Sequence, residues 1–372
     1  MKFLSKLSKK ELKGKTAILA TDYNDENEKD SYRIEKSIPS IKYLNKTCEK
    51  VIILSHKKRF SPDFTDIERN ALSLKNIAKI LERKLGKKVL FINFKDFTRA
   101  KQIISEEKKA KIFLLENLRF FAEEEANDET FGRILSELGN IFINDAFSVS
   151  HRENASITQI PKFLPGSLGL LFESEIKHLN QIMSNPKKPF VIVLGGAKAS
   201  DKLPIMEHLL DKVSFCLLGG VPANTFLKAQ GVDIKASAYE ESFLNKANDL
   251  LKTGKIVIPN DLVWKEDKIY DAGIKTSKDY ANIISKAKTV LWNGPLGYFE
   301  EKKYMKGSEI VAKAIAKSKA FSVVGGGESS ELVKELGLEK KFSFLSTGGG
   351  AMLEYLSGKK LPGIEALENT NP

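Results

Sequence analysis

The sequence predicts an α/β protein of two domains, each a parallel sheet flanked by helices, joined by a helix and a hinge. Three observations predict this class. The chain has 372 residues, more than one core usually serves. Short runs rich in Val, Ile, Leu and Phe alternate with helix-like stretches such as residues 72–85. A break rich in Pro and Lys, residues 185–189, follows a helical pattern near the middle.

The apolar runs give the expected strands in order. In the first half they are residues 16–21, 50–55, 88–93, 111–115 and 140–144, and in the second half 189–194, 213–218, 255–258, 288–292, 321–324 and 342–345. Apolar runs separated by helices are typical of parallel strands buried on both faces. Each half should therefore form a Rossmann-like sheet. We expect one domain over residues 1–170, a connecting helix over 171–184 and a second domain over 185–353.

Composition narrows the function classes. Apolar residues make up 42% and charged residues 29%, which is typical of a globular protein. The formal charge of +12 would attract small polyanions, nucleic acid or an anionic membrane, but most lysines alternate with acids. Only Cys48 and Cys216 are present, and no apolar run could span a bilayer, so we expect a cytoplasmic protein that binds neither membrane nor nucleic acid. Salt-sensitive binding of DNA or RNA would support the alternative of a basic nucleic-acid-binding protein.

Basic and polar residues follow the strands of the first half. They are Asp22-Tyr23-Asn24, then Arg33, then His56-Lys57-Lys58-Arg59, then Arg119, then His151-Arg152. Any one of them alone would be typical of a surface ion pair. Ligands bind at the carboxyl ends of parallel strands, and the arginine fork matches phosphate and carboxylate oxygens. This basic rim therefore predicts a site for a compact polyanion.

Glycines take the same positions in the second half. The segments are Gly195-Gly196-Ala197-Lys198, Gly219-Gly220, Asn293-Gly294-Pro295, Gly325-Gly326-Gly327-Glu328 and Ser346-Thr347-Gly348-Gly349-Gly350. Glycine lets backbone amides approach a phosphate, and a glycine turn that opens a helix directs its N–H groups at an anion. The sequence contains neither a P-loop nor a complete G-x-G-x-x-G motif. A nucleotide held in another way is expected here.

Together these motifs resemble the phosphoglycerate kinase family, in order and over nearly the whole chain. The segments that match are Asp22-Tyr23-Asn24, Leu54-Ser55-His56, Glu116-Asn117-Leu118-Arg119, Asn144-Asp145-Ala146-Phe147, Gly195 to Lys198, Trp292-Asn293-Gly294-Pro295 and Ser346 to Ala351. The resemblance implies reversible phosphoryl transfer between 1,3-bisphosphoglycerate and ADP, giving 3-phosphoglycerate and ATP, with Mg²⁺. It also implies a monomer, with phosphoglycerate on the first domain, residues 354–372 packing back onto that domain, and nucleotide on the second.

The resemblance assigns roles by position. Substrate binding falls to Asp22, Tyr23, Asn24, Arg33, His56, Lys57, Lys58, Arg59, Arg119, His151 and Arg152. Nucleotide binding falls to Gly196, Lys198, Lys202, Gly219, Gly220, Asn293, Pro295, Glu300, Gly326, Gly327, Glu328 and Ser329, with Glu300 as the ribose-binding acid and Glu328 as the metal ligand. The amides of Gly348, Gly349 and Gly350 would hold a phosphate. Arg33 and Lys198 are the expected catalytic cations, brought together by domain closure.

Several positions depart from the family pattern. Glu328 replaces an Asp, which predicts weaker or altered use of Mg²⁺ because this ion tolerates little deviation in geometry. Ser148 replaces a Gly, which could strain a turn and shift His151. Asp25-Glu26, Lys57-Lys58 and Ile269 also differ from the usual residues. These changes leave one further alternative, a diverged paralogue that binds phosphoglycerate or nucleotide with little turnover.

Overall fold

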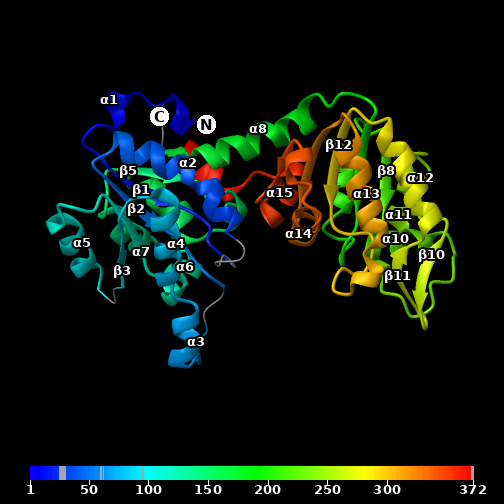
Figure 1. Cartoon of the computed structure of the whole chain (residues 1–372), viewed down its shortest axis with the longest axis horizontal. Helices are drawn as coiled ribbons and strands as arrows, with labels where there is room; N and C mark the ends of the chain where they lie inside the picture. Colours follow the sequence, from blue (N-terminus) through cyan, green and yellow to red (C-terminus); the bar gives the residue numbers. More distant parts are fainter. Residues whose placement is uncertain (25–30, 59–60, 62, 94–95, 370–372) are drawn as a thin grey trace. The chain divides into compact units, whose positions relative to one another are not determined.

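The chain folds into two compact units. Residues 1–24, 31–58, 61, 63–93 and 96–369 are described by the computed structural model. Unit 1 comprises Met1–Ile176 with Lys360–Pro372, and unit 2 comprises Lys177–Lys359. Each unit has its own sheet with helices on its faces (Figure 1), and helix α8, Leu170–Ser184, contains the point where the chain passes from one unit to the other.

The sheet of unit 1 has six parallel strands in the order β3-β4-β2-β1-β5-β6. Its strands are β1 Thr16–Ala20, β2 Lys50–Leu54, β3 Val89–Ile92, β4 Ile112–Leu115, β5 Ile141–Asn144 and β6 Gly166–Leu168. The first five confirm the predicted strands to within two residues. Sequence reasoning missed β6, because Gly-Ser-Leu has no apolar periodicity to mark it.

Eight α-helices are found among the described residues assigned to unit 1 alone. They are α1 Lys9–Leu12, α2 Tyr32–Thr47, α3 Asp66–Ala71, α4 Lys75–Leu85, α5 Phe97–Glu106, α6 Ala122–Glu125, α7 Glu129–Ser136 and α16 Pro362–Glu368. In α4, Ile77, Ala78, Ile80 and Leu81 form one buried stripe, the period expected of an amphipathic helix. The buried stripes of the helices and every second side chain of several strands pack into one hydrophobic core.

The main sheet of unit 2 also has six parallel strands, in the order β14-β13-β12-β7-β8-β9. Its strands are β7 Phe190–Leu194, β8 Phe215–Leu218, β9 Ile256–Val257, β12 Thr289–Asn293, β13 Phe321–Gly325 and β14 Phe344–Leu345. All six were predicted. An antiparallel hairpin of β10 Leu262–Lys265 and β11 Lys268–Ala272 was not.

The missed hairpin lacks the usual turn signal. Its turn contains Glu266 at φ 51°, in the left-handed region that favours Gly or Asn. The helices of unit 2 are α9 Leu203–Leu209, α10 Gly220–Ala229, α11 Leu244–Leu251, α12 Ile274–Ser285, α13 Lys306–Lys317, α14 Gly327–Glu335 and α15 Gly349–Leu356. Several of them begin at the glycines of the predicted nucleotide rim.

The strand order reverses at the same point in each unit, and the carboxyl edge of the sheet at this point is called the crevice of that unit. In unit 1, β1 lies between β2 and β5. The strands β2, β4 and β3 extend the sheet on one side of β1, and β5 and β6 extend it on the other. In unit 2, β7 lies between β8 and β12 in the same way. The carboxyl ends of strands at such a switch point are where ligands bind in open α/β sheets. The segments after β1 and β5, and after β7 and β12, are therefore the places to look for a site.

Candidate active site

The segment after β1 carries a buried carboxylate. Asp22 is 8% exposed, and its Oδ2 accepts a hydrogen bond of 2.6 Å from Arg33 Nη1 while its Oδ1 accepts one of 2.8 Å from the Asn24 N–H. Burial opposes ionisation, but His56, Arg33 and the hydrogen bonds outweigh it and keep the Asp22 pKa below its ordinary value. Tyr23 points the other way, with its hydroxyl 3.0 Å from Ser37 Oγ in the core.

His56, after β2, completes this buried group. Its Nε2 lies 3.3 Å from Asp22 Oδ1, and the residue is 7% exposed. Burial of the ring lowers the His56 pKa to about 4, against the attraction of Asp22 and with the help of Arg119 and the other nearby arginines. The imidazole is therefore neutral at pH 7, and the positive charge of the site comes from guanidinium groups.

Arg119 is brought in from the segment after β4. It lies in the short 3-10 helix η2, Leu118–Phe120, where its Nη1 donates to the Lys58 carbonyl at 2.9 Å and its Nε lies 3.9 Å from Glu125 Oε1. Lys58 donates its N–H to Asn24 Oδ1 at 2.7 Å. Lys57 directs its Nζ to the Ala71 carbonyl. Arg59 lies outside the described residues.

The segment after β5 holds His151 and Arg152, the remaining residues of the predicted basic rim. Arg152 is exposed and its Nε donates to His151 Nε2 at 3.4 Å. Nearby, buried Glu124 accepts hydrogen bonds from the N–H and hydroxyl of Ser156, which tie α6 to the chain just beyond Arg152. Ser148 lies in the 3-10 helix η3, Phe147–Val149, outside the left-handed region. The expectation of a strained turn there was wrong, because the backbone at Ser148 does not need glycine.

The crevice of unit 2 is built mainly from backbone. Gly195 donates to the Asn293 carbonyl at 3.0 Å, and Gly196 donates to the Pro295 carbonyl at 2.8 Å. Gly220, at φ 55°, begins α10, and a Cβ there would lie 2.5 Å from the Gly196 carbonyl oxygen. Side chains of ordinary size would therefore separate these segments, and only glycine allows them to meet.

One buried cation lies among these glycines. Lys202 is 7% exposed and donates to Asn293 Oδ1. Burial lowers the Lys202 pKa to about 8, although Asp201 and Glu328 oppose the shift. Ser329, on the first turn of α14, accepts a hydrogen bond from the Gly294 N–H at 2.9 Å. Lys198 lies exposed just beyond the Gly195-Gly196 turn.

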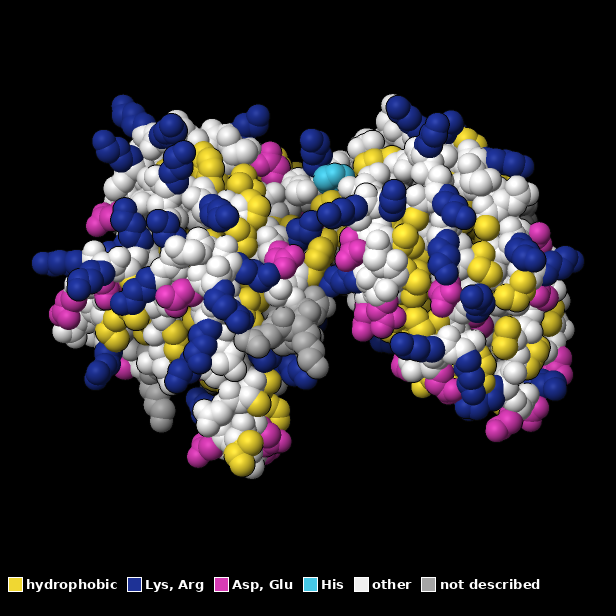
Figure 2. Space-filling view, in the orientation of Figure 1, with side chains coloured by type: hydrophobic (Ala, Val, Ile, Leu, Met, Phe, Trp, Pro, Cys, Tyr) yellow, Lys and Arg dark blue, Asp and Glu magenta, His cyan; other side chains and the backbone are white. Residues whose placement is uncertain are grey.

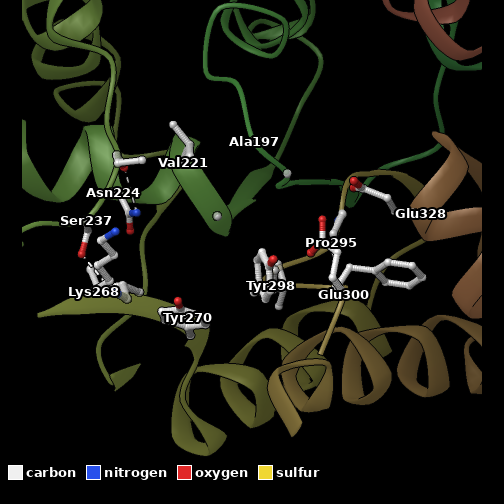
Figure 3. A pocket seen from close by; sticks show the side chains of 17 residues that line it. Ala197, Val221, Asn224, Ser237, Lys268, Tyr270, Pro295, Tyr298, Glu300 and Glu328 are labelled. Carbon is white, nitrogen blue, oxygen red and sulfur yellow. Dashed lines mark hydrogen bonds between the residues drawn. The ribbon is translucent and has the colours of Figure 1, made fainter. Parts of the chain in front are cut away.

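A cavity of about 290 Å³ extends from this crevice over the hairpin (Figure 3). Asn224, Ser237 and Lys268 gather at one end, and Glu300 and Glu328 lie at the other. The rings of Tyr270 and Tyr298 lie between them, with centroids 5.4 Å apart. Ile269, the departure noted above, lines the same cavity and donates its N–H to Ser237 Oγ at 2.8 Å.

A second cavity of about 250 Å³ adjoins the first. The two share Gly196, Ala197 and Glu328, and the second is also lined by Lys198, Asp201, Lys202, Asn293, Gly294, Gly326, Ser329, Gly349 and Leu353. Burial, together with Glu300, raises the Glu328 pKa above its ordinary value, although Lys202 opposes this. The larger cavity is flanked by aromatic rings and the smaller by glycines and two lysines. This division matches a base with its sugar and a chain of phosphates.

The comparisons with known proteins agree with this geometry. A family model for phosphoglycerate kinase matches residues 7–359. The chain belongs to the phosphoglycerate kinase family. A curated phosphoglycerate kinase of Finegoldia magna is 40% identical over 370 residues, which cover 91% of each chain. The solved phosphoglycerate kinase of Pyrococcus horikoshii is 30% identical with a TM-score of 0.86, covering 100% of this chain and 99% of that one. That of Coxiella burnetii is 33% identical with a TM-score of 0.82, covering 99% and 98%.

Membership of the phosphoglycerate kinase family gives the reaction. The chain is a phosphotransferase that uses a carboxyl group as acceptor, and it catalyses reversible phosphoryl transfer between 1,3-bisphosphoglycerate and ADP, giving 3-phosphoglycerate and ATP. The predicted two-domain α/β fold is confirmed by the same relatives. Its substrates are small molecules, and adenine nucleotides are among them.

Sequence reasoning missed part of the lining of the larger cavity. Asn224, Lys268, Tyr270 and Tyr298 line it but were not among the predicted residues, and two of them come from the unpredicted hairpin. The available signal was Tyr298, directly after Gly297. Its role cannot be recognised until β11 lies beside the loop after β12, where the Tyr298 ring contacts the Tyr270 ring.

Positive and negative side chains are mixed over the face of the molecule that Figure 2 shows. Figure 2 shows Lys and Arg side chains spread over that face of both units with Asp and Glu among them. Within the described ranges, no three His, Cys, Asp or Glu side chains are grouped so as to hold a metal. Nor does any described helix combine the length and apolar character needed to cross a membrane.

Proposed function

We propose that unit 1 binds the phosphoglycerate and that unit 2 binds the nucleotide. The observation that supports this most is the contrast between the two crevices. Arg33 and Arg119 surround Asp22 and neutral His56 in unit 1, whereas glycines line the crevice of unit 2. A phosphoglycerate presents two anionic groups and one hydroxyl. Guanidinium forks suit the anions, and a carboxylate suits the hydroxyl donor.

The substrate rim includes side chains at several depths. Asp22, Arg119 and His56 are buried, Arg33 is half-buried, and Arg152 is exposed. Asp22 and Arg119 are held by hydrogen bonds before any ligand arrives, so little of their rotamer freedom remains to be lost on binding. Exposed Arg152 would order only when a phosphate or carboxylate pairs with it.

On unit 2 the two cavities divide the nucleotide. The base and ribose would occupy the larger cavity, where Glu300 can accept hydrogen bonds from ribose hydroxyls. The phosphates would occupy the smaller cavity, beside Lys198 and Lys202. Gly326, which precedes α14, and Gly349, the first residue of α15, line that cavity, and backbone N–H groups at helix N-termini favour an anion.

Mg²⁺ is proposed to accompany the nucleotide, with Glu328 as its protein ligand. Magnesium sites commonly use one or two carboxylates together with substrate phosphates, so the lack of a three-residue cage among the described residues is compatible with them. Glu328 fits this role because it lines the smaller cavity, where the phosphates would lie, and a bound cation would favour its charged form against the burial that raises its pKa. When bound, the ion would neutralise phosphate charge.

For the transfer itself we assign Arg33 and Lys198 as the cations that stabilise the migrating group. Direct in-line transfer forms no covalent enzyme intermediate and depends on positioning and on neutralisation of spreading charge. Arg33 belongs to unit 1 and Lys198 to unit 2, and we propose that domain closure brings both to the migrating group. Closure would also exclude water, which hydrolyses acyl phosphates.

The test is ATP-dependent phosphorylation of 3-phosphoglycerate, measured with Mg²⁺ titrated and with Lys198→Ala in parallel. We expect magnesium-dependent turnover by the wild type and a fall in kcat of roughly 1,000-fold in the variant, the scale of losing one electrostatic stabiliser of the transition state. Lys252→Ala, an exposed lysine paired with Asp249, serves as the matched control and should retain full turnover.

Two results would overturn these assignments. Full activity of Lys198→Ala would remove that lysine from the mechanism. Binding of 3-phosphoglycerate by folded wild type without turnover would favour the diverged paralogue. A monomeric state and a cytoplasmic location stay predictions.

A further inference from the structure

The Asp22 carboxylate has one partner that no assignment above explains. Besides Arg33 and the Asn24 N–H, it accepts a hydrogen bond from the hydroxyl of Ser148. Arg33 Nη1 and Ser148 Oγ both donate to the same oxygen, Oδ2. Ser148 is 8% exposed, as is Asp22, so water has little access to replace the hydroxyl.

This contact spans the switch point of unit 1. Asp22 follows β1 and Ser148 follows β5, 126 residues later. The two strands are neighbours in the sheet, paired from Ala17 and Ile141 onward. The Ser148 hydroxyl therefore ties together the two segments from which the acid-binding crevice is built. A glycine or alanine at this position would leave the same backbone without the tie.

We propose that Ser148 is a positioning residue for phosphoglycerate recognition, holding the Asp22 carboxylate in the orientation that anchors Arg33 and reads the substrate hydroxyl. This inference rests on the proposed binding of the acid by unit 1. A carboxylate turns about its terminal side-chain bond, a torsion with broad minima, unless its oxygens are fixed. Arg33 donates to Oδ2 from α2, and Ser148 supplies a second donor to the same oxygen from the segment after β5.

The role makes a distinctive kinetic prediction. Ser148→Ala should raise KM for 3-phosphoglycerate roughly tenfold, the scale of one hydrogen bond to a charged group, while KM for ATP stays unchanged. Preference for 3-phosphoglycerate over the same acid lacking its hydroxyl should fall by about the same factor, because the carboxylate that reads the hydroxyl is no longer held. A structural defect alone would not alter this ratio.

A double-mutant cycle separates positioning from packing. In an Asp22→Asn background, Ser148→Ala should change KM for 3-phosphoglycerate by less than about twofold, since the group that Ser148 positions has already been altered. Ser136→Ala is the matched control: it removes another buried hydroxyl of unit 1, one that donates to the Arg133 carbonyl at 2.6 Å, and should leave both KM values unchanged.

The outcomes are distinguishable. Wild-type protein that neither binds nor phosphorylates 3-phosphoglycerate would overturn the proposed function itself. Wild-type turnover with an unchanged KM and an unchanged hydroxyl preference in Ser148→Ala would overturn only the role of Ser148. Additive effects in the cycle would do the same. Circular dichroism and thermal unfolding of each variant establish that the comparison is made between folded proteins.

Discussion

The crevices of the two units occupy the same place in their sheets but are made from different materials. In unit 1 the walls are charged side chains, and Asp22, His56 and Arg119 are buried together. In unit 2 the walls are backbone, brought close by glycines, with Lys202 as the buried cation. The comparison teaches that a crevice lined by charged side chains is sensitive to loss of a charge and to pH. A crevice lined by closely spaced backbone is sensitive to side chains that add volume.

The largest expected effect is on shape in unit 2. Gly220→Ala places a methyl group 2.5 Å from the Gly196 carbonyl oxygen at a positive φ, and we expect a loss of about 4 kcal/mol in the free energy of unfolding. Gly231→Ala, at the other end of α10, also has a positive φ but open space around it, and should lose only about 1 kcal/mol. Equal losses in urea denaturation would show that close approach does not matter.

The next effect is on charge in unit 1. Unfolded His56 takes up a proton as pH falls below about 6.5, whereas the folded residue resists until about 4, so the unfolded state binds more protons between these values. Stability should therefore fall as pH falls through this window, by about 3 kcal/mol from this group.

His56→Gln tests this prediction by difference. The change in unfolding free energy between pH 7 and pH 4.5 should shrink by about 2 to 3 kcal/mol in the variant. A difference is needed because Asp145, whose pKa burial raises to about 6, contributes with the opposite sign as pH rises through the same range. An unchanged pH dependence would mean that the folded imidazole is protonated.

A third prediction concerns Lys202, the buried lysine in the crevice of unit 2. Lys202→Met removes a charge from the smaller cavity and leaves Asn293 Oδ1 without its donor, so KM for ATP should rise roughly 30-fold, about 2 kcal/mol. KM for 3-phosphoglycerate should not change. A similar rise in both constants would mean that the two crevices do not divide the substrates as proposed.

Much of this molecule could be predicted from its sequence because the information is local. Apolar runs marked eleven of the fourteen strands found among the described residues, and the residues after them included Arg33, Arg119 and Lys202. These residue types are informative wherever a strand ends, since the carboxyl edge of a parallel sheet is where ligands bind. The roles themselves stay proposals.

Three features lay beyond local patterns. The hairpin of β10 and β11 was missed because Glu266 occupies a turn position that usually demands Gly or Asn. Tyr23 and Asp22 are adjacent in the segment after β1, yet Tyr23 packs in the core and Asp22 joins the site, a difference set by the tertiary packing of that segment. The Tyr270 and Tyr298 contact also required the hairpin to be placed first.

By itself, the sequence determined the alternation of strands and helices, the two sheets and the contrast between a basic and a glycine-rich edge. Only the tertiary structure decided the strand order, and with it the pairing of β1 with β5 and of β7 with β12. The physical reason is that periodicity reports which face of an element is buried, while strand order depends on how distant elements pack. The hydrogen bond from Ser148 to Asp22 exists only because that packing brings the two residues together.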